Sequence, residues 1–384
     1  MAKLRIKLKQ HTPIIQFQGE QDGAVLRATE FKPKLDKFIK KYAFNDEFDN
    51  YKEYLIGYKY GKDKEAFKDK EAFNYKVRFF VEEENYKKYS VPKNFPFYFN
   101  NIGSAAENDT NKFIFVNSID VEFFSLNSKL IKEIEIWINK FLAVHNFGFR
   151  QNKGFGSFTS AEDNFDYLSL IKGLEPKSPL FYIKYDKRDA YKEMMEDAAI
   201  IYQLMKSGIN YPREPKSYHK SYLFNYMKNR NIGNEKRFIK EEFFSINKDG
   251  MQKKYVRALL GLAEGVTFNS PAPKDKGRIN IKYKSEIERF KSPILFKIID
   301  KVLFIIPQCI EDEENYSIYN RKFEFCKGEN NSAVIYTPRK DEFSLNDFLR
   351  DFVDYFNNQL EVDKAHNILE NKLRHAKRKR IEVR

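Results

Sequence analysis

The stretch "GFRQNKGFGS", which begins at Gly148, combines bare backbone with positive charge. The chain has 384 residues and only 16 glycines, yet Gly148, Gly154 and Gly156 fall within these ten positions. Glycine permits a left-handed backbone and close approach to a ligand, and successive N–H groups in such a turn bind anions. Arg150 and Lys153 supply cations that suit a phosphate. The stretch predicts either a phosphate-binding loop or a glycine-rich turn without a ligand.

The side chains between these glycines favour RNA as the ligand. Gln151 and Asn152 can donate hydrogen bonds to a phosphate, a sugar or a base edge, and Phe155 can stack on a base. The GxxxxGK[ST] spacing of a P-loop is absent, since Gly148 and Gly154 are six positions apart and Phe155 follows. The stretch also follows a helical pattern, whereas the glycine loop of a dinucleotide-binding unit opens a helix.

Histidine, cysteine and acidic residues do not form a recognisable metal site. The two cysteines are Cys309 and Cys326, too few for a disulfide framework or a thiolate site. None of the five histidines is spaced as a metal ligand from another histidine or a cysteine. The acidic run at 311–315 lacks the regular spacing of a calcium loop. We expect neither a metal nor a cofactor, and the sequence contains no HD pair, GGDD motif or P-loop.

Two further basic stretches could contact a nucleic acid. Residues 211–231 interleave basic and aromatic side chains, which suits base stacking with phosphate contact and equally suits a loop packed on its own rings. Residues 371–384 carry seven basic residues and one acid. A helix there would turn its apolar side chains to the protein and its charges toward RNA, an acidic subunit or solvent.

Hydrophobic periodicity indicates the elements that position the glycine stretch. Residues 3–17 alternate at first and predict a strand, bent at Pro13, and a short helix is expected from Pro33. Strand-like segments follow at 75–81, 95–99, 112–116 and 121–124. A helix that Ser128 would cap leads into the glycine stretch. The order of strand, helix, strands, helix and strand predicts a ferredoxin-like (RRM-like) domain with an insertion.

The second half repeats this order loosely. A strand at 179–185 precedes a long helix that ends at Gly208, and an amphipathic helix covers 344–356. Further strands are expected at 278–283, at 293–299 and in the apolar run "KVLFIIPQCI". We therefore predict an α+β chain of two tandem ferredoxin-like domains with insertions, at 1–165 and 166–384, the second ending in a basic helix.

Composition limits the classes of partner. Hydrophobic residues make up 42% and charged residues 32% of the chain, as in globular proteins. The formal net charge of +14 favours a polyanion, although a lysine-rich proteome would give the same excess. The N-terminus, "MAKLRIKLKQ", is an alternating basic strand without an apolar signal core, and no apolar run is long enough to span a bilayer. These features predict a cytoplasmic protein.

Four stretches resemble the CRISPR-associated RAMP superfamily. "RQNKGFGSF" (150–158) is similar to its basic stretch followed by Gly-Phe-Gly-Ser, and "TPIIQFQG…LRATEFKPKL" (12–35) to its opening strand and first helix. "IERFKSPILFKI" (287–298) resembles a strand entry in the later half, and "LLGLAEG" (259–265) the "LGLP" segment. The set most resembles the large two-domain head subunits of type III-B (Cmr-type) effector complexes.

The resemblance implies how the glycine stretch would meet RNA. The backbone at Gly154 and Gly156 would lie against the RNA, Arg150 and Lys153 would neutralise phosphates, and Ser157 would donate a further hydrogen bond. Additional RNA contacts are implied for the side chains of Arg27, Lys32, Lys34, Lys291 and Ser292. Pro33 and Asp36 depart from the family pattern, in which glycine and a basic residue are usual.

The resemblance further implies a non-catalytic subunit of a type III CRISPR ribonucleoprotein. Its partners would be guide RNA on the 3′ side, target RNA captured in antiviral defence, and other subunits of the effector complex, with no membrane involved. One alternative is a metal-independent guide-processing endoribonuclease of the same superfamily, in which His11 would act as general acid or base. Others are another terminal RAMP subunit, or an assembly protein that binds acidic partners and no RNA.

Overall fold

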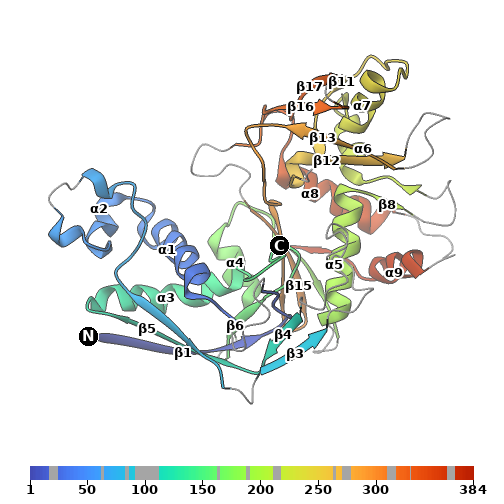
Figure 1. Cartoon of the computed structure of the whole chain (residues 1–384). Coiled ribbons are helices and arrows are strands. Elements are labelled where there is room, and N and C mark those ends of the chain that lie inside the picture. Colours follow the sequence, from blue (N-terminus) through green and yellow to red (C-terminus); the bar gives the residue numbers. More distant parts are fainter. Residues whose placement is uncertain are drawn as a thin grey trace. The chain divides into compact units, whose positions relative to one another are not determined.

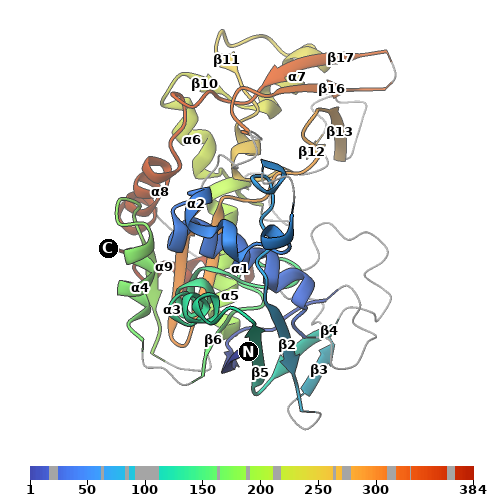
Figure 2. The same cartoon turned by 90° about the vertical axis from the view of Figure 1, so that its left-hand side faces the viewer.

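The computed structural model divides the chain into two compact units (Figures 1 and 2). It describes residues 1–16, 25–61, 65–82, 86–90, 112–161, 165–186, 191–210, 218–262, 265–269, 278–308, 317–328, 330–360 and 368–384. Unit 1 comprises Met1–Glu196, Phe296–Ile306 and Val383–Arg384, and unit 2 comprises Asp197–Leu295 and Pro307–Glu382. Both units are discontinuous in sequence. The domain limits of 1–165 and 166–384 therefore remain a prediction about the family's domains and do not describe these units.

The first sheet of unit 1 has the strand order β2-β5-β1-β6, with antiparallel neighbours. Its strands are β1 (Ala2–Gln10), β2 (Lys76–Phe80), β5 (Ile119–Ser125) and β6 (Phe158–Ser160). Helix α1 (Ala28–Phe44) follows β1, and helix α3 (Ser128–Val144) follows β5. Both helices lie on the same side of this sheet (Figure 1). The core of the unit fills the layer between helices and sheet.

Helix α1 begins five residues before the expected start at Pro33, which lies inside the helix. A proline there cannot donate the backbone hydrogen bond of its turn. The fully buried ring of Phe31 accounts for the earlier start, because it stacks on Phe147 at 5.1 Å and meets Phe141 edge-on at 5.1 Å. Burial of one aromatic side chain is worth about 1.5–3 kcal/mol, which offsets the lost bond.

Helix α3 matches its predicted amphipathic pattern. Ile134, Phe141 and Leu142 are fully buried on one side. Asn127, rather than the predicted Ser128, caps the helix by accepting hydrogen bonds from the N–H groups of the second and third helical residues. The helix ends where His145 adopts an extended backbone conformation, and the glycine stretch follows directly.

A second sheet of unit 1 has the strand order β14-β15-β7-β18. Its strands are β7 (Phe181–Lys184), β14 (Ile294–Ile299), β15 (Val302–Pro307) and β18 (Glu382–Val383). Every residue of β14 is buried, as its continuous apolar run suggests. β14 and β15 are far from the rest of unit 1 in sequence, yet they form half of this sheet, with β15 central beside β7 and β14 at the edge.

The remaining elements of unit 1 are short or peripheral. They are α2 (Phe48–Tyr51), β3 (Tyr86–Ser90), β4 (Lys112–Val116) and α4 (Tyr167–Leu174), and α5 (Tyr191–Lys206) continues into unit 2. The predicted strand at 95–99 lies outside the described residues. The expected bend at Pro13 corresponds to the end of β1 at Gln10, after which Ile14 pairs with Ile114 as an isolated bridge.

Unit 2 contains an antiparallel sheet of order β12-β13-β16-β17. Its strands are β12 (Gly265–Asn269), β13 (Arg278–Lys284), β16 (Lys322–Cys326) and β17 (Ser332–Tyr336). Its other elements are β8 (Ile209–Asn210), β9 (Tyr218–His219), α6 (Tyr222–Lys228), β10 (Ile232–Gly233), α7 (Glu235–Phe243), β11 (Gln252–Lys253), α8 (Leu345–Asp354) and α9 (Ile368–Lys377). The chain is thus a mixed α/β protein with antiparallel sheets, as predicted at that level.

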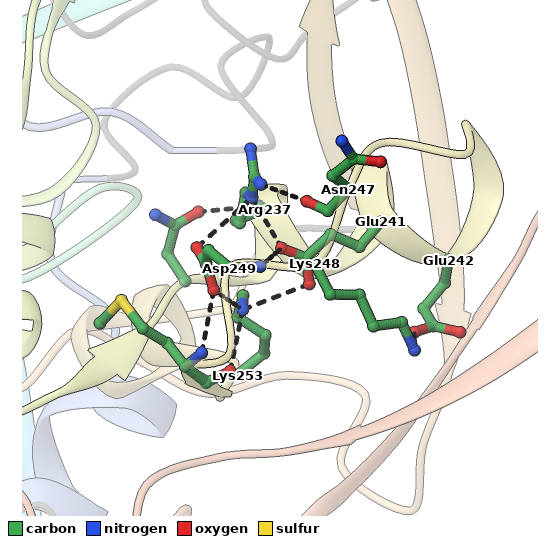
Figure 3. A network of polar contacts seen from close by, with 9 residues as sticks. Arg237, Glu241, Glu242, Asn247, Lys248, Asp249 and Lys253 are labelled. Carbon is green, nitrogen blue, oxygen red and sulfur yellow. Dashed lines mark hydrogen bonds and ion pairs between the residues drawn. The ribbon is translucent and has the colours of Figure 1, made fainter.

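A network of ion pairs fastens the segment after α7 back onto that helix (Figure 3). Arg237 Nε donates to Glu241 Oε1 at 2.7 Å, and an Arg237 Nη group donates to the carbonyl of Asn247. Lys253 contacts Asp249 and lies 3.2 Å from the second oxygen of Glu241. All these residues belong to α7 or to the segment that follows it, up to Lys253, so the network stabilises the local fold.

Candidate nucleic-acid interface

The glycine segment, defined as residues 146–157, is a closed loop between α3 and β6. Its two ends pair with each other, because Asn146 and Ser157 form a bridge and the N–H of Phe147 donates to the carbonyl of Gly156 at 2.9 Å. The loop therefore leaves and re-enters the core at one place.

Its glycines are required by contacts inside the protein. Gly148 and Gly156 both have positive φ, at 79° and 67°. A Cβ on Gly156 would lie 1.9 Å from the carbonyl oxygen of Phe147, and one on Gly148 would lie 2.6 Å from that of Ile15. Gly154, at φ 89°, is buried against β14. In this conformation the backbone at Gly154 and Gly156 packs inside the protein, and its contact with RNA stays a prediction.

Many backbone N–H groups of the segment also have internal acceptors. The N–H of Gly148 donates to both carboxylate oxygens of Glu30, at 2.9 and 3.1 Å. Those of Phe149 and Gly156 donate to the carbonyls of Ile15 and Pro13, each at 2.8 Å. These N–H groups are therefore not available to an anion.

The strand β14 holds the far side of the segment. Phe296 donates its N–H to the carbonyl of Asn152 at 3.1 Å, and the amide of Asn146 donates to the carbonyl of Phe296 at 2.9 Å. The hydroxyl of Ser157 donates to the carbonyl of Ile298 at 2.6 Å. Ser157 is fully buried and its hydroxyl bonds inside the protein, so its hydrogen bond to RNA stays a prediction.

Two further predicted RNA contacts are buried. Phe155 has no exposed surface and packs 5.6 Å from the ring of Phe113, so its ring cannot stack on a base in this conformation. Asn152 is only 8% exposed. Ser157, Phe155 and Asn152 were predicted as RNA contacts from polarity or aromaticity, and these properties do not distinguish a packed loop from an exposed one.

Lys297 bonds to the residues that flank both ends of the segment. This fully buried side chain donates to the carbonyl of His145 at 2.7 Å and to that of Phe158 at 3.1 Å. Burial lowers the pKa of its ammonium group well below the ordinary value. Sequence reasoning missed this residue, and the signal that could have found it is a single lysine inside the apolar run "PILFKII".

Lys34 ties helix α1 to the segment. Its ammonium group donates to Glu30 at 2.6 Å, to Gln151 Oε1 at 2.7 Å and to the carbonyl of Asn146 at 3.1 Å. An ammonium group has three donors, and all three are used here. The RNA contact implied for Lys34 stays a prediction, because in this conformation all its donors are used within the protein. Lys34 thereby fixes the amide of Gln151.

Lys32 is likewise engaged within unit 1. Its ammonium group lies 2.5 Å from Asp36 Oδ2, donates to the carbonyl of Phe73 at 2.8 Å and lies 4.3 Å from the ring centre of Tyr75. Burial raises the pKa of Asp36 to about 6, against the opposing effect of the Lys32 charge. The departure of Asp36 from the family pattern thus supplies the partner of Lys32.

Arg150 and Lys153 are the two cations that the segment places near its surface. Arg150 has a left-handed backbone, at φ 56°, and its guanidinium lies 5.3 Å from the ring centre of Phe149. Both side chains are half-buried. Burial, and then the charge of Arg150, lower the pKa of Lys153 to about 8. Two neighbouring cations that disfavour each other's charge form a site that an anion would stabilise.

The other predicted contact residues lie apart from this pair in the chain. Arg27 is the half-buried N-terminal cap residue of α1. Lys291 and Ser292 belong to unit 2, where Lys291 is exposed and the hydroxyl of Ser292 accepts the N–H of Ile294 at 3.3 Å.

His11 is a buried structural histidine. Its Nδ1 accepts the N–H of Asp300 at 3.2 Å, so its Nε2 carries the proton and donates to the hydroxyl of Thr159 at 2.7 Å. Burial lowers its pKa to about 3, against the attraction of Asp300 and with smaller contributions from Lys297 and Lys9. Both ring nitrogens are occupied, so the geometry does not favour a general acid or base here.

The described part of the stretch 211–231 packs its rings on those of α8 and the turn that follows it. Tyr226 is 2% exposed and meets Phe348 edge-on at 5.3 Å, while Tyr222 stacks on Tyr355 at 4.9 Å. Residues 211–217 lie outside the described part.

In the basic tail, α9 turns Leu373 and Ala376 to the core, as its predicted pattern required.

Within the described ranges, the structure contains no helix long and apolar enough to cross a membrane. The same residues contain no cluster of three histidine, cysteine or acidic side chains that could hold a metal ion.

Comparison with known proteins identifies the family. A search of the curated proteins found no match. Among solved structures, the crystal structure of Cmr1 from Pyrococcus furiosus in its apo form is similar, with a TM-score of 0.42 and 9% identity over 87% of this chain and 94% of that one. The family model of the Cmr1 N-terminal domain matches residues 1–209, and that of the Cmr1 C-terminal domain matches residues 218–375. Because these two models together span most of its length, the chain belongs to the Cmr1 family and is a subunit of a type III-B CRISPR effector complex.

Proposed function

We propose that this chain is a non-catalytic RNA-binding subunit, which contacts guide RNA on its 3′ side and assists target capture in antiviral defence. The observation that carries the RNA-binding part is the pair Arg150 and Lys153 on the glycine segment. Guide and target would be matched by base pairing, and the protein would recognise backbone and shape.

The glycine segment supports this role because it holds its two cations in a fixed frame. Glu30, Lys34 and the strand β14 all bond to the segment. Binding of a phosphate there would cost little conformational entropy, because the loop is already held in place. The negative charge of the phosphate would also favour the protonated form of Lys153, whose pKa is lowered by burial and then by the charge of Arg150.

We further propose that unit 1 contains two ferredoxin-like sheets. In the order β2-β5-β1-β6, the first and third strands in sequence are central and the second and fourth are at the edges. The sheet β14-β15-β7-β18 has the same arrangement, with β7 and β15 central. This is the strand order of a split βαβ fold.

The test is RNA binding by Arg150→Ala/Lys153→Ala across a salt series. The probe is labelled single-stranded RNA with the host's CRISPR repeat and a spacer. Each phosphate contact on a single strand contributes about 0.7 to the slope of log affinity against log salt, so the slope should fall by roughly 1.4. Lys129→Ala/Lys132→Ala removes the same charge from the exposed surface of α3 and should leave the slope unchanged. Equal slopes in both variants would refute the proposal.

Cleavage is measured in EDTA on the same samples. Intact RNA is expected, since both nitrogens of His11 are bonded internally. A discrete cut within the repeat that disappears in His11→Ala would make the protein a guide-processing endoribonuclease.

A further inference from the structure

The outer face of the sheet β2-β5-β1-β6, on the side away from α1 and α3, gathers positive charge. Alternate residues of a strand point to one side of a sheet. On β1 these are the exposed Lys3, Arg5, Lys7 and Lys9, and on β2 the exposed Lys76 and Arg78. The strand β5 between them contributes Asp120, Glu122 and Phe124. We call these residues, with Phe80 of β2, the basic sheet face.

The register of the strands arranges this face in rows. Phe124 lies between Lys3 and Lys76, and Glu122 lies between Arg5 and Arg78. The third row consists of Lys7, Asp120 and Phe80. Six basic side chains on these strands thus outnumber their two acidic ones. Lys9 also pairs with Asp300 at 2.6 Å, which leaves five basic side chains against Asp120 and Glu122.

Glu122 orders the face without neutralising it. It is 4% exposed, and its Oε2 accepts a hydrogen bond from Arg5 Nε at 2.9 Å and lies 3.5 Å from Lys3 Nζ. The side chain of Arg5 nevertheless remains 77% exposed. The hydrogen bond from Arg5 holds the pKa of Glu122 below its usual range, so the carboxylate stays charged and keeps the cations in place.

Aromatic rings lie among these cations. The ring centre of Phe124 is 5.8 Å from Lys76 Nζ and 5.2 Å from the guanidinium of Arg78. Phe80 is 51% exposed at the end of its row. A row of cations spaced about 6.8 Å along a strand, with rings beside it, suits an extended nucleic-acid strand whose phosphates meet the cations and whose bases stack.

We propose that the basic sheet face is a second RNA-binding surface, which holds single-stranded RNA along β1. The occupant is RNA because the face combines excess positive charge with exposed aromatic surface, the two features of sequence-tolerant single-strand binding. This inference goes beyond the proposal for Arg150 and Lys153 and shares with it only the class of ligand.

The experiment compares two triple variants of the full chain. Lys7→Ala/Lys76→Ala/Arg78→Ala removes three exposed cations from the face, and Lys59→Ala/Lys129→Ala/Lys132→Ala removes three exposed lysines elsewhere in unit 1. With a labelled uridine-rich single strand, the first should lower the salt slope by about 2, since each contact contributes about 0.7. The second should leave it unchanged. Equal slopes for the two triple variants would overturn the proposal.

A second measurement addresses stacking. Phe80→Ala should weaken binding of the same RNA roughly five-fold or more, as the loss of one stacked base does. Tyr60→Ala removes a ring that is 85% exposed outside the face and should have no effect. Equal affinities of Phe80→Ala and wild type, together with unchanged thermal unfolding, would remove stacking from the proposal.

The two RNA proposals fail separately. Loss of slope in the sheet variant with an unaffected Arg150→Ala/Lys153→Ala variant would refute only the role of the glycine segment, and the reverse result would refute only the sheet face. If the sheet variant instead lost co-purification with other effector subunits while its RNA slope equalled the control, the face would be a protein interface and this inference would be wrong.

Discussion

The charges of Lys153 and Arg150 could be predicted from the sequence, whereas the burial of the residues around them could not. The side chains of Lys153 and Arg150 lie near the surface of the glycine segment. Phe155 and Ser157 stand in the same ten residues and are fully buried. The difference depends on contacts with Phe113 and Ile298, which are distant in sequence. Local composition contains no information about such contacts.

Lys153 should make RNA binding depend on pH. Its pKa in the free protein is about 8, and a bound phosphate would favour its charged form. Affinity should be constant below about pH 8, where Lys153 is already protonated, and should fall as pH rises from about 8 to 9. Lys153→Arg should abolish this fall, since a guanidinium stays charged. Dissociation constants from fluorescence anisotropy would show it, and the same fall in both proteins would contradict the assignment.

Gly156 should tolerate no side chain. In Gly156→Ala the new Cβ would meet the carbonyl of Phe147 at 1.9 Å with φ at 67°, so the loss in unfolding free energy should exceed about 2 kcal/mol. Gly173 lies in α4, and a Cβ added there would have no neighbouring atom within 4 Å, so Gly173→Ala should stabilise by about 0.5–1 kcal/mol. Chemical denaturation measures both, and equal stabilities would show that the loop relaxes freely.

Among the elements, β14 holds the glycine segment through hydrogen bonds that are distant in sequence. It supplies the carbonyls of Phe296 and Ile298 and the amine of Lys297. The strand itself was expected from its apolar run, and so were α3, α8 and the strands β1, β2, β4, β5, β7, β13 and β15, because hydrophobic periodicity is a local property. The paired strands β16 and β17 were missed. The pairing of β14 with a loop about 140 residues earlier was not expected, because periodicity does not identify partners.

Lys297 should link stability to pH. Its pKa is lowered well below 10.5 in the folded protein, so the unfolded chain binds the proton more tightly. The contribution of this residue to folding is complete above about pH 10.5 and is lost as pH falls toward the lowered pKa. The unfolding free energy of wild type relative to Lys297→Met should therefore rise between about pH 7 and pH 9, by at most about 1.4 kcal/mol per pH unit. A constant difference would mean that the buried amine keeps its ordinary pKa.

At the scale of the whole molecule, a fragment cut at the end of the N-terminal family match would not contain all of unit 1. Residues 1–209 correspond to that match but lack Phe296–Ile306, which belongs to unit 1. Fast hydrogen exchange in the glycine segment is expected for this fragment, because its partners on β14 are missing. A fragment in which a flexible linker adds residues 291–310 should recover the protection. Equal exchange in both fragments would show that β14 is dispensable for the segment.

Because unit 1 is discontinuous in sequence, the ribosome makes the glycine segment well before it makes the strand β14. Ile298 follows Ser157 by 141 residues, and Phe296 follows Asn146 by 150. At roughly 5–20 residues per second, the ribosome needs about 7 to 30 seconds to produce the strand that closes the loop. During that interval the nascent chain displays the loop's polar groups without their final partners. Translation speed through residues 158–298 thus decides how long this surface stays open to chaperones and stray polyanions.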